Sequence, residues 1–204
     1  TKEFDIGLIA KGTCPRKYIP AQDGQIRVPL VIDDVEINSG DYVYVDKTQI
    51  AYDLINSYSY VFLSRPRRFG KSLFLDTLHN IFEAKKEYFK GLAIEDKWDW
   101  DVSYPVITIS FAEGKITSAK DLEDKFEEIF LLNQKKLDVT CQYKASDRRC
   151  FSELIRKANE KYNQNVVILV DEYDKPILDN ITKPEIAESI RDGLVNFYSV
   201  IKGS

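Results

Sequence analysis

The stretch RPRRFGKS, residues 65–72, follows the apolar run Tyr60–Leu63, where a phosphate-binding loop would lie. A loop that wraps a polyphosphate needs inward-facing backbone N–H groups, a glycine where a side chain would collide, and a lysine that reaches the terminal phosphates. Gly70 and Lys71 supply the glycine and the lysine, and the hydroxyl of Ser72 can bind a magnesium ion. The triplet therefore predicts a phosphate-binding loop between a strand and a helix, with the helix dipole directed at the anion.

The loop departs from the GxxxxGK[ST] pattern at its first position, where Arg65 stands in place of glycine. The β-carbon of Arg65 and the missing N–H of Pro66 change the usual backbone cradle. Arg67 and Arg68 would then add positive charge around the phosphates or around a nucleic acid beside them. The alternative interpretation is that the arginines form a basic turn exposed to solvent. Phe69 lies inside the loop, where it would buttress the loop or contact a base.

The segments on either side of the loop show regular periodicity. We expect a strand over Tyr42–Val45, a short helix over Gln49–Ile55 and a strand over Tyr60–Leu63. After the loop, apolar residues recur at i, i+4, i+7 and i+8, the stripe of an amphipathic helix: Phe74, Leu78, Ile81 and Phe82. Spacing places Phe62, Phe74 and Phe82 in the core, and His79 on the polar side of the helix.

Further strands and helices alternate towards the C-terminus. Tyr104–Phe111 is predicted to be a core strand, and Ser118 and Asp121 form a capping box that opens a long helix. A second helix carries Phe151, Leu154, Ile155, Ala158 and Tyr162, and a last one begins at a box formed by Thr182 and Glu185. Such alternation implies a parallel sheet covered on both faces.

The run Val166–Val170 is apolar without alternation, as expected of a strand buried on both faces, and it ends in Asp171 and Glu172. Carboxylates at the carboxyl end of such a strand lie at the ligand-binding edge of an α/β sheet. We expect this strand and the strand before the loop to be neighbours. Asp171 would then help Ser72 to hold magnesium, and Glu172 would orient or deprotonate the attacking water.

Composition narrows the class of protein. The chain has 204 residues, 44% hydrophobic and 30% charged, which indicates one globular domain with a sizeable core or one domain plus an appendage. A net charge of -4 argues against broad coating of nucleic acid, and no secretory signal or membrane-length apolar run is evident, so we expect a cytoplasmic protein.

The spacing of Cys14, Cys141 and Cys150 indicates plain thiols, with neither a disulfide framework nor a zinc site. Because methionine is absent, we expect a fragment or a processed chain.

Four blocks resemble the bacterial and archaeal AAA-ATPase-like family: YVDKT (44–48), RPRRFGKS (65–72), YPVITISF (104–111) and VVILVDEYDKPIL (166–178). Members typically join such an ATPase region to a C-terminal nuclease-like domain of the PD-(D/E)XK type, and in this family arginine is the usual residue at the position of Arg65. The resemblance implies catalytic roles for Lys71 and Glu172 and a magnesium site at Ser72 and Asp171. The implied nucleotide-binding residues are Arg65, Arg67, Arg68, Phe69, Gly70, Lys71, Ser72 and Leu73.

The sequence thus predicts an α/β protein, a three-layer P-loop NTPase-type parallel sheet with flanking helices, truncated at the C-terminus. Residues 1–41 form an N-terminal extension that includes an edge strand within Ile26–Ile32, and residues 42–204 form an incomplete AAA-ATPase-like domain. The predicted activity is binding of ATP with Mg²⁺ and slow hydrolysis that switches an attached effector. The alternative is a binding module that uses the arginine-rich loop on nucleic acid or protein without turnover. The sequence leaves open whether the protein forms a homo-oligomer, and no membrane partner is expected.

Overall fold

The computed structural model describes residues 7–10, 31–32, 35–36, 45–64 and 70–201. At its centre lies a four-stranded sheet in which every pairing is parallel, with the strand order β4-β1-β6-β5. The strands are β1 (Gly7–Ala10), β4 (Tyr60–Leu63), β5 (Val106–Ser110) and β6 (Val167–Asp171). The short strands β2 (Val31–Ile32) and β3 (Val35–Glu36) pair with each other in an antiparallel two-stranded sheet.

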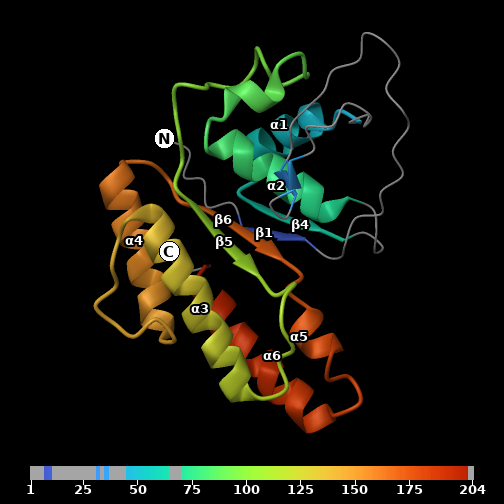
Figure 1. Cartoon of the computed structure of the whole chain (residues 1–204), viewed down its shortest axis with the longest axis vertical. Helices are drawn as coiled ribbons and strands as arrows, with labels where there is room; N and C mark the ends of the chain where they lie inside the picture. The colour runs from blue at the N-terminus through green and yellow to red at the C-terminus, as the bar shows by residue number, and fades with distance from the viewer. Residues whose placement is uncertain (1–6, 11–30, 33–34, 37–44, 65–69, 202–204) are drawn as a thin grey trace.

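Helices lie on both sides of the parallel sheet (Figure 1). One side carries α1 (Thr48–Ser57), α2 (Lys71–Phe82) and the 3₁₀ turn η1 (Lys86–Phe89). The other side carries α3 (Ala119–Leu137), α4 (Arg148–Tyr162) and α6 (Pro184–Tyr198), and the four-residue α5 (Lys175–Leu178) connects β6 to α6. The predicted mixed α/β class with a parallel sheet is confirmed, whereas the assignment to the P-loop type of fold stays a prediction.

Strand β6 divides the core in two because its side chains alternate between the faces of the sheet. Ile168 and Val170 belong to the core beneath α3, α4 and α6, and Val167 and Leu169 belong to the core beneath α1 and α2. Every residue of β6 is buried. This burial explains why the strand is apolar without alternation, as predicted.

A stack of phenylalanine rings fills the core on the α3, α4 and α6 side. The ring of Phe197 in α6 lies 4.2 Å from that of Phe126 and 4.6 Å from that of Phe151, measured between centroids. The rings of Phe130 and Phe151 are 5.2 Å apart. Gly193 brings α6 close to α3, since a Cβ there would lie only 2.8 Å from Leu122 Cδ2. These rings hold three helices together over β5 and β6.

The outer edge of β5 is closed by one side chain. Asn133 in α3 is 4% exposed, its Oδ1 accepts from the backbone N–H of Thr108 at 2.9 Å, and its Nδ2 donates to the carbonyl of Thr108 at 2.8 Å. The amide thus substitutes for a neighbouring strand at one residue of the edge. An edge whose backbone groups are paired is a poor template for another strand.

Four details of the fold differ from the predictions. The strands that precede the loop and end in Asp171 are not neighbours, because β1 pairs with both β4 and β6. Phe62, predicted to be buried, is 56% exposed and meets Tyr173 edge-on at 5.6 Å between centroids. The helices on its side of the sheet pack over β5 and β6, so the prediction that Phe62 is buried is wrong.

The other two differences concern a helix start and the cysteines. Helix α6 begins at Pro184 with Lys183 as its N-cap and no side-chain capping bond among the described residues, so the predicted box of Thr182 and Glu185 is wrong. Cys141 and Cys150, predicted to be plain thiols, form a disulfide with a Cα–Cα separation of 5.5 Å. Their separation of nine positions carries no pairing signal, and only the fold of the α3–α4 connection brings them together.

Several predicted segments coincide with observed elements, and two lie outside the described residues. The helices predicted from Gln49, Lys71 and Ser118 and the strands at Tyr60–Leu63, within Tyr104–Phe111 and within Val166–Val170 are all present. The strand predicted over Tyr42–Val45 and residues 26–30 of the predicted edge strand fall largely outside the description. The domain division at residue 41 stays a prediction. No helix within the described ranges has the length and apolar character that a membrane span requires.

A charged cluster links the C-terminal half of α2 to α3. The carboxylate of Glu83 accepts from His79 Nε2 at 2.9 Å, Lys85 Nζ at 2.8 Å and Lys136 Nζ at 2.6 Å. Burial works against ionisation of Glu83, but these bonds outweigh it and hold its pKa far below the usual range. Burial dominates instead for Asp76, whose pKa rises to about 6 although His79, Lys85 and Asn80 oppose the rise.

We expect Asp76→Asn to stabilise the protein near pH 7 by roughly 2 to 3 kcal/mol and to change little near pH 4. The folded-state pKa is raised, so the folded protein binds the proton more tightly and loses stability as pH rises from about 4 to about 6. Asparagine removes that loss. Urea unfolding of both proteins across this range measures the difference. The contribution of Glu83 has the opposite sign and is lost only on acidification below its ordinary pKa. A difference that is constant with pH would contradict the assignment to Asp76.

We expect Asn133→Leu to destabilise the protein by about 2 kcal/mol, because the N–H and C=O of Thr108 lose their partner under an apolar side chain. Asn159→Leu is the matched control, since the amide of Asn159 also bonds a backbone carbonyl, that of Gln164, but at an exposed position. Urea denaturation should show a lower midpoint for the first variant and almost no change for the control. Equal midpoints for the two variants would show that Asn133 does not seal the edge.

Candidate functional site

The N-terminus of α2 has the geometry of an anion site. Gly70 is the N-cap residue and has a left-handed backbone with φ of 73°, which a residue with a side chain rarely adopts. Among the described residues no side chain caps this helix, and its first turn contains no acidic residue. The first backbone N–H groups and the positive end of the helix dipole are therefore directed at whatever lies in front of Gly70.

Lys71 begins this helix and is buried, with only 1% of its surface exposed. Lysine is almost never fully buried unless its charge is compensated, because desolvation of an ammonium group is costly. Ser72 and Leu73 follow it in the first turn and are partly buried. Arg65, Arg67, Arg68 and Phe69 lie outside the described residues, so their predicted roles stay predictions.

Asp171 ends β6 and is 9% exposed. Its Oδ1 accepts from the backbone N–H of Glu172 at 2.9 Å. Glu172 has φ of 51°, a left-handed conformation that costs a non-glycine residue roughly 1 kcal/mol or more. The chain therefore turns sharply as it leaves the strand. Strained backbone of this kind is concentrated at functional sites, where the surrounding structure maintains it.

The sheet register brings the two motifs to one level. Ala10 of β1 pairs with Leu63 on one side and with Asp171 on the other, so β4 and β6 end together at the carboxyl edge of the sheet. Two strand spacings place their axes about 10 Å apart. Helix α2, which follows β4, packs against β1 and β6. Lys71 and Asp171 are thus two buried charged residues on segments that meet at the same edge.

The predicted metal site fits this edge only as part of a larger coordination sphere. Within the described part of the chain, no group of three or more His, Cys, Asp or Glu side chains is placed to hold a metal ion. Magnesium at nucleotide sites takes most of its ligands from phosphates and water, with one or two from protein. Ser72 and Asp171 match that requirement as a hydroxyl and a carboxylate, and the magnesium site stays a prediction.

Sequence patterns did not indicate the residues that hold the surrounding loops. Lys175 and Asn180 donate to backbone carbonyls of Gly114 and Ile116, which lie more than sixty positions earlier in the chain. Asp46 accepts from the N–H of Thr48 at 2.8 Å and from that of Ala93 at 2.8 Å, and so joins the start of α1 to the segment after η1. These contacts join residues that are far apart in the sequence or lie in loops. Such contacts leave no periodic pattern of residues in the sequence.

Comparison with known proteins identifies relatives. A family model described as AAA-ATPase-like, "Predicted AAA-ATPase", matches residues 29–204, and a second, described as "Aldolase/RraA", matches residues 1–51. The chain is 54% identical over 164 residues to a protein of Azotobacter chroococcum mcd 1 named "Uncharacterized protein in vnfD 5'region". That match covers 80% of this chain and 32% of the relative, so the chain spans about a third of the relative's length. No solved structure matches the chain.

The first family model covers well over half of the chain and includes both motifs, residues 65–72 and 166–178. The Aldolase/RraA match is confined to residues 1–51, too little of the chain to assign a family. The resemblance that the motifs indicated is therefore confirmed, and the family membership points to nucleotide binding in general. The chain belongs to the AAA-ATPase-like family, whose members are described as predicted AAA-ATPases.

Proposed function

We propose that this protein binds ATP with magnesium and hydrolyses it slowly. The observation that carries the proposal is the placement of buried Lys71 at a helix N-terminus that no described side chain caps, at the sheet edge where β6 ends in buried Asp171. Buried charges of opposite sign at one sheet edge suit a ligand that carries both phosphates and a cation. Family membership supports the nucleotide as that ligand.

In this proposal the chain's own residues have separate roles. The backbone N–H groups of the first turn of α2 and the Lys71 ammonium bind the phosphate oxygens. Glu172 accepts a proton from a water molecule as its oxygen attacks the γ-phosphorus, and the bond from that phosphorus to the β-phosphate oxygen breaks. The products are ADP and inorganic phosphate. The left-handed backbone of Glu172 would fix the direction from which its carboxylate meets the water.

Magnesium would be held by Ser72 and Asp171, and when bound it offsets the negative charge of the phosphates. Arg65, Arg67 and Arg68 would supply further positive charge from the loop before Gly70, and Phe69 would support that loop. The ion and the arginines would both reduce the repulsion between the negative charges of the polyphosphate, which lie close together. Asp171 is well suited to the ion because it ends a strand buried on both faces.

We further propose that the nucleotide state is transmitted to an effector elsewhere in the full-length protein, nuclease-like by the family resemblance. The match covers 32% of the relative, so that protein has room for such a region outside the match. In this proposal the change at the sheet edge is transmitted through α5 and α6, which follow Glu172 in the chain and contact each other.

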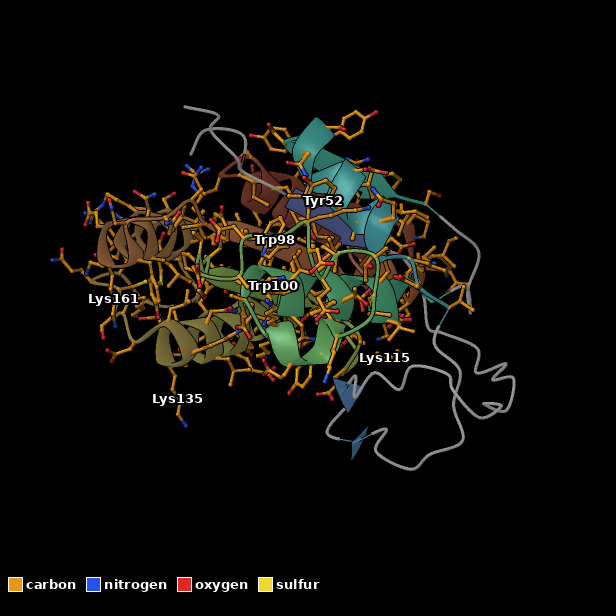
Figure 2. All side chains as sticks on the ribbon, turned by 90° about the horizontal axis from the view of Figure 1, so that it is seen from above. Tyr52, Trp98, Trp100, Lys115, Lys135 and Lys161 are labelled. Atoms are coloured by element: carbon orange, nitrogen blue, oxygen red, sulfur yellow. A yellow bond between two sulfur atoms is a disulfide. The ribbon has the colours of Figure 1, made fainter. Side chains whose placement is uncertain are left out.

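Substitution of Lys71 tests the binding step. We expect Mg-ATP at about a hundred times its Kd to stabilise the native protein by roughly 2.7 kcal/mol. Lys71→Met keeps the length of the buried side chain but removes the charge, so the ATP-dependent rise in Tm should disappear. Lys115→Met is the control, because Lys115 is exposed in the loop after β5 (labelled in Figure 2) and should retain the rise. Circular dichroism confirms that both variants are folded.

Full ATP affinity in Lys71→Met would disprove the proposed site. Salt-sensitive binding of DNA without any Mg-ATP stabilisation would instead support the binding module that uses the arginine-rich loop. The same thermal assay with and without magnesium separates these outcomes.

Substitution of Glu172 tests the chemical step. We expect Glu172→Gln to bind ATP with an affinity close to that of the native protein while kcat falls roughly 100-fold, because the amide cannot accept the proton. Glu113→Gln changes an exposed carboxylate in the β5–α3 connection and should leave both quantities unchanged. Phosphate release and ATP titration measure the two quantities. Unchanged turnover in Glu172→Gln would remove Glu172 from the mechanism.

A further inference from the structure

The turn that carries Glu172 is short and continues directly into a helix. The N–H of Lys175 donates to the carbonyl of Glu172 at 3.0 Å, and the N–H groups of Ile177 and Leu178 donate to the carbonyl of Asp174 at 3.1 and 3.0 Å. Helix α5 has only four residues, so it is too short to be stable by its own hydrogen bonds. The left-handed conformation of Glu172 therefore needs support from outside this segment.

Lys175 supplies the first external support. Its Nζ donates to the carbonyl of Gly114 at 2.7 Å and to Asp179 Oδ2 at 2.9 Å. Gly114 lies in the loop that follows β5, the strand next to β6, and has a φ of 78°. One ammonium group thus joins the connection after β6 to the connection after β5, at the carboxyl edge of the sheet where Asp171 ends its strand.

Asn180 supplies the second support, one turn further along the chain. It is 2% exposed, and both protons of its amide are used, one on the carbonyl of Ile116 at 2.6 Å and the other on the carbonyl of Pro176 at 2.9 Å. Ile116 is itself buried in the core on the α3, α4 and α6 side. Asn180 therefore anchors the end of α5 to a fixed part of the same β5 loop.

We propose that Lys175 and Asn180 are positioning residues that clamp the β6–α5 turn to the β5–α3 loop and hold Glu172 in its strained, reactive orientation. The inference rests on the proposed ATP hydrolysis and extends it to two side chains that contact backbone carbonyls. Figure 1 shows why a clamp can act here: β5 and β6 run side by side, and α5 follows directly from the end of β6.

Two contacts tie one short segment to one loop, one on each side of α5. Lys175 lies three residues after Glu172, and Asn180 lies eight residues after it, so the clamp brackets α5 at both ends. Loss of either bond would remove the restraint on α5 at that end and leave the one at the other end. A displacement of about 1 Å at a catalytic group is enough to cost up to a hundredfold in rate.

The competing explanation is that Lys175 only stabilises the fold and has no effect on the orientation of Glu172. Lys161 provides a control for this explanation. Lys161 Nζ donates to the carbonyl of Asp138 at 2.7 Å and to Asp138 Oδ2 at 2.6 Å, the same combination of backbone carbonyl and carboxylate. Lys161 lies at the end of α4, at the periphery of the molecule (Figure 2). Lys161 Nζ also donates to the carbonyl of Leu137 at 3.2 Å. Lys175→Met and Lys161→Met therefore remove the same kinds of bond, the first near the carboxyl edge of the sheet and the second far from it.

The test compares kcat, ATP affinity and Tm for the native protein and these variants. We expect Lys175→Met to lower kcat roughly tenfold while the Kd for Mg-ATP changes less than about twofold, and Lys161→Met to change neither. Lys175→Arg keeps the charge and donors and should recover most of the rate. Asn180→Asp, which places a carboxylate against two carbonyls, should lower kcat in the same way. Equal kcat in Lys175→Met and Lys161→Met, or a loss in Lys175→Met that only follows the loss of Tm, would overturn the proposal.

Amide hydrogen exchange without nucleotide separates failure of the clamp from failure of the proposed function. We expect faster exchange at residues 112–118 and 171–176 in Lys175→Met than in the native protein, and no such change in Lys161→Met. If the native protein bound but did not hydrolyse ATP, the hydrolysis proposal would fail, and the catalytic role of the clamp with it. Faster local exchange would then still establish the clamp as a conformational device, whereas unchanged exchange in Lys175→Met would overturn the clamp itself.

Discussion

The parallel pairing of β1 with both β4 and β6 is the constraint on which the rest of the structure depends. Because Ala10 pairs with Leu63 and with Asp171, the two strands end at one level and at a fixed spacing. A shift of one residue in either pairing would turn every side chain of that strand to the opposite face. It would also remove Asp171 from the edge where α2 begins. The register therefore sets the core and the site together.

The carboxyl edge gathers features that are costly to a folded protein. Lys71 and Asp171 are buried charges, and Glu172 adopts a left-handed conformation. Each of these costs free energy unless a partner or a ligand compensates it. Along the outer side of β5, Asn133 satisfies the backbone N–H and C=O of Thr108. The buried charges and the left-handed turn together make the carboxyl edge the candidate site.

Elements with strong local patterns could be predicted from the sequence. Helix α2 was indicated by Phe74 and Leu78, and β6 by an apolar run that ends in a carboxylate. Ser118 caps α3 as predicted, because its Oγ accepts from the N–H of Asp121 at 3.1 Å. The predictions failed where the outcome depends on distant residues. Phe62 has the spacing of a core residue but lies beyond the helices that cover β6, and the box at Thr182 competes with Pro184 for the start of α6.

Local periodicity in the sequence was enough to predict most of the elements from residue 48 onward, and side-chain chemistry was enough to name candidate residues for phosphate and magnesium. It did not indicate β1, the strand that lies between β4 and β6. Only the tertiary structure decided the strand order, the pairing of Cys141 with Cys150, and the contacts of Lys175 and Asn180 with the loop after β5. Those contacts join segments that the chain brings together only after the sheet has formed. Their energy comes from hydrogen bonds and burial between residues far apart in sequence, and no short window of the sequence contains both partners.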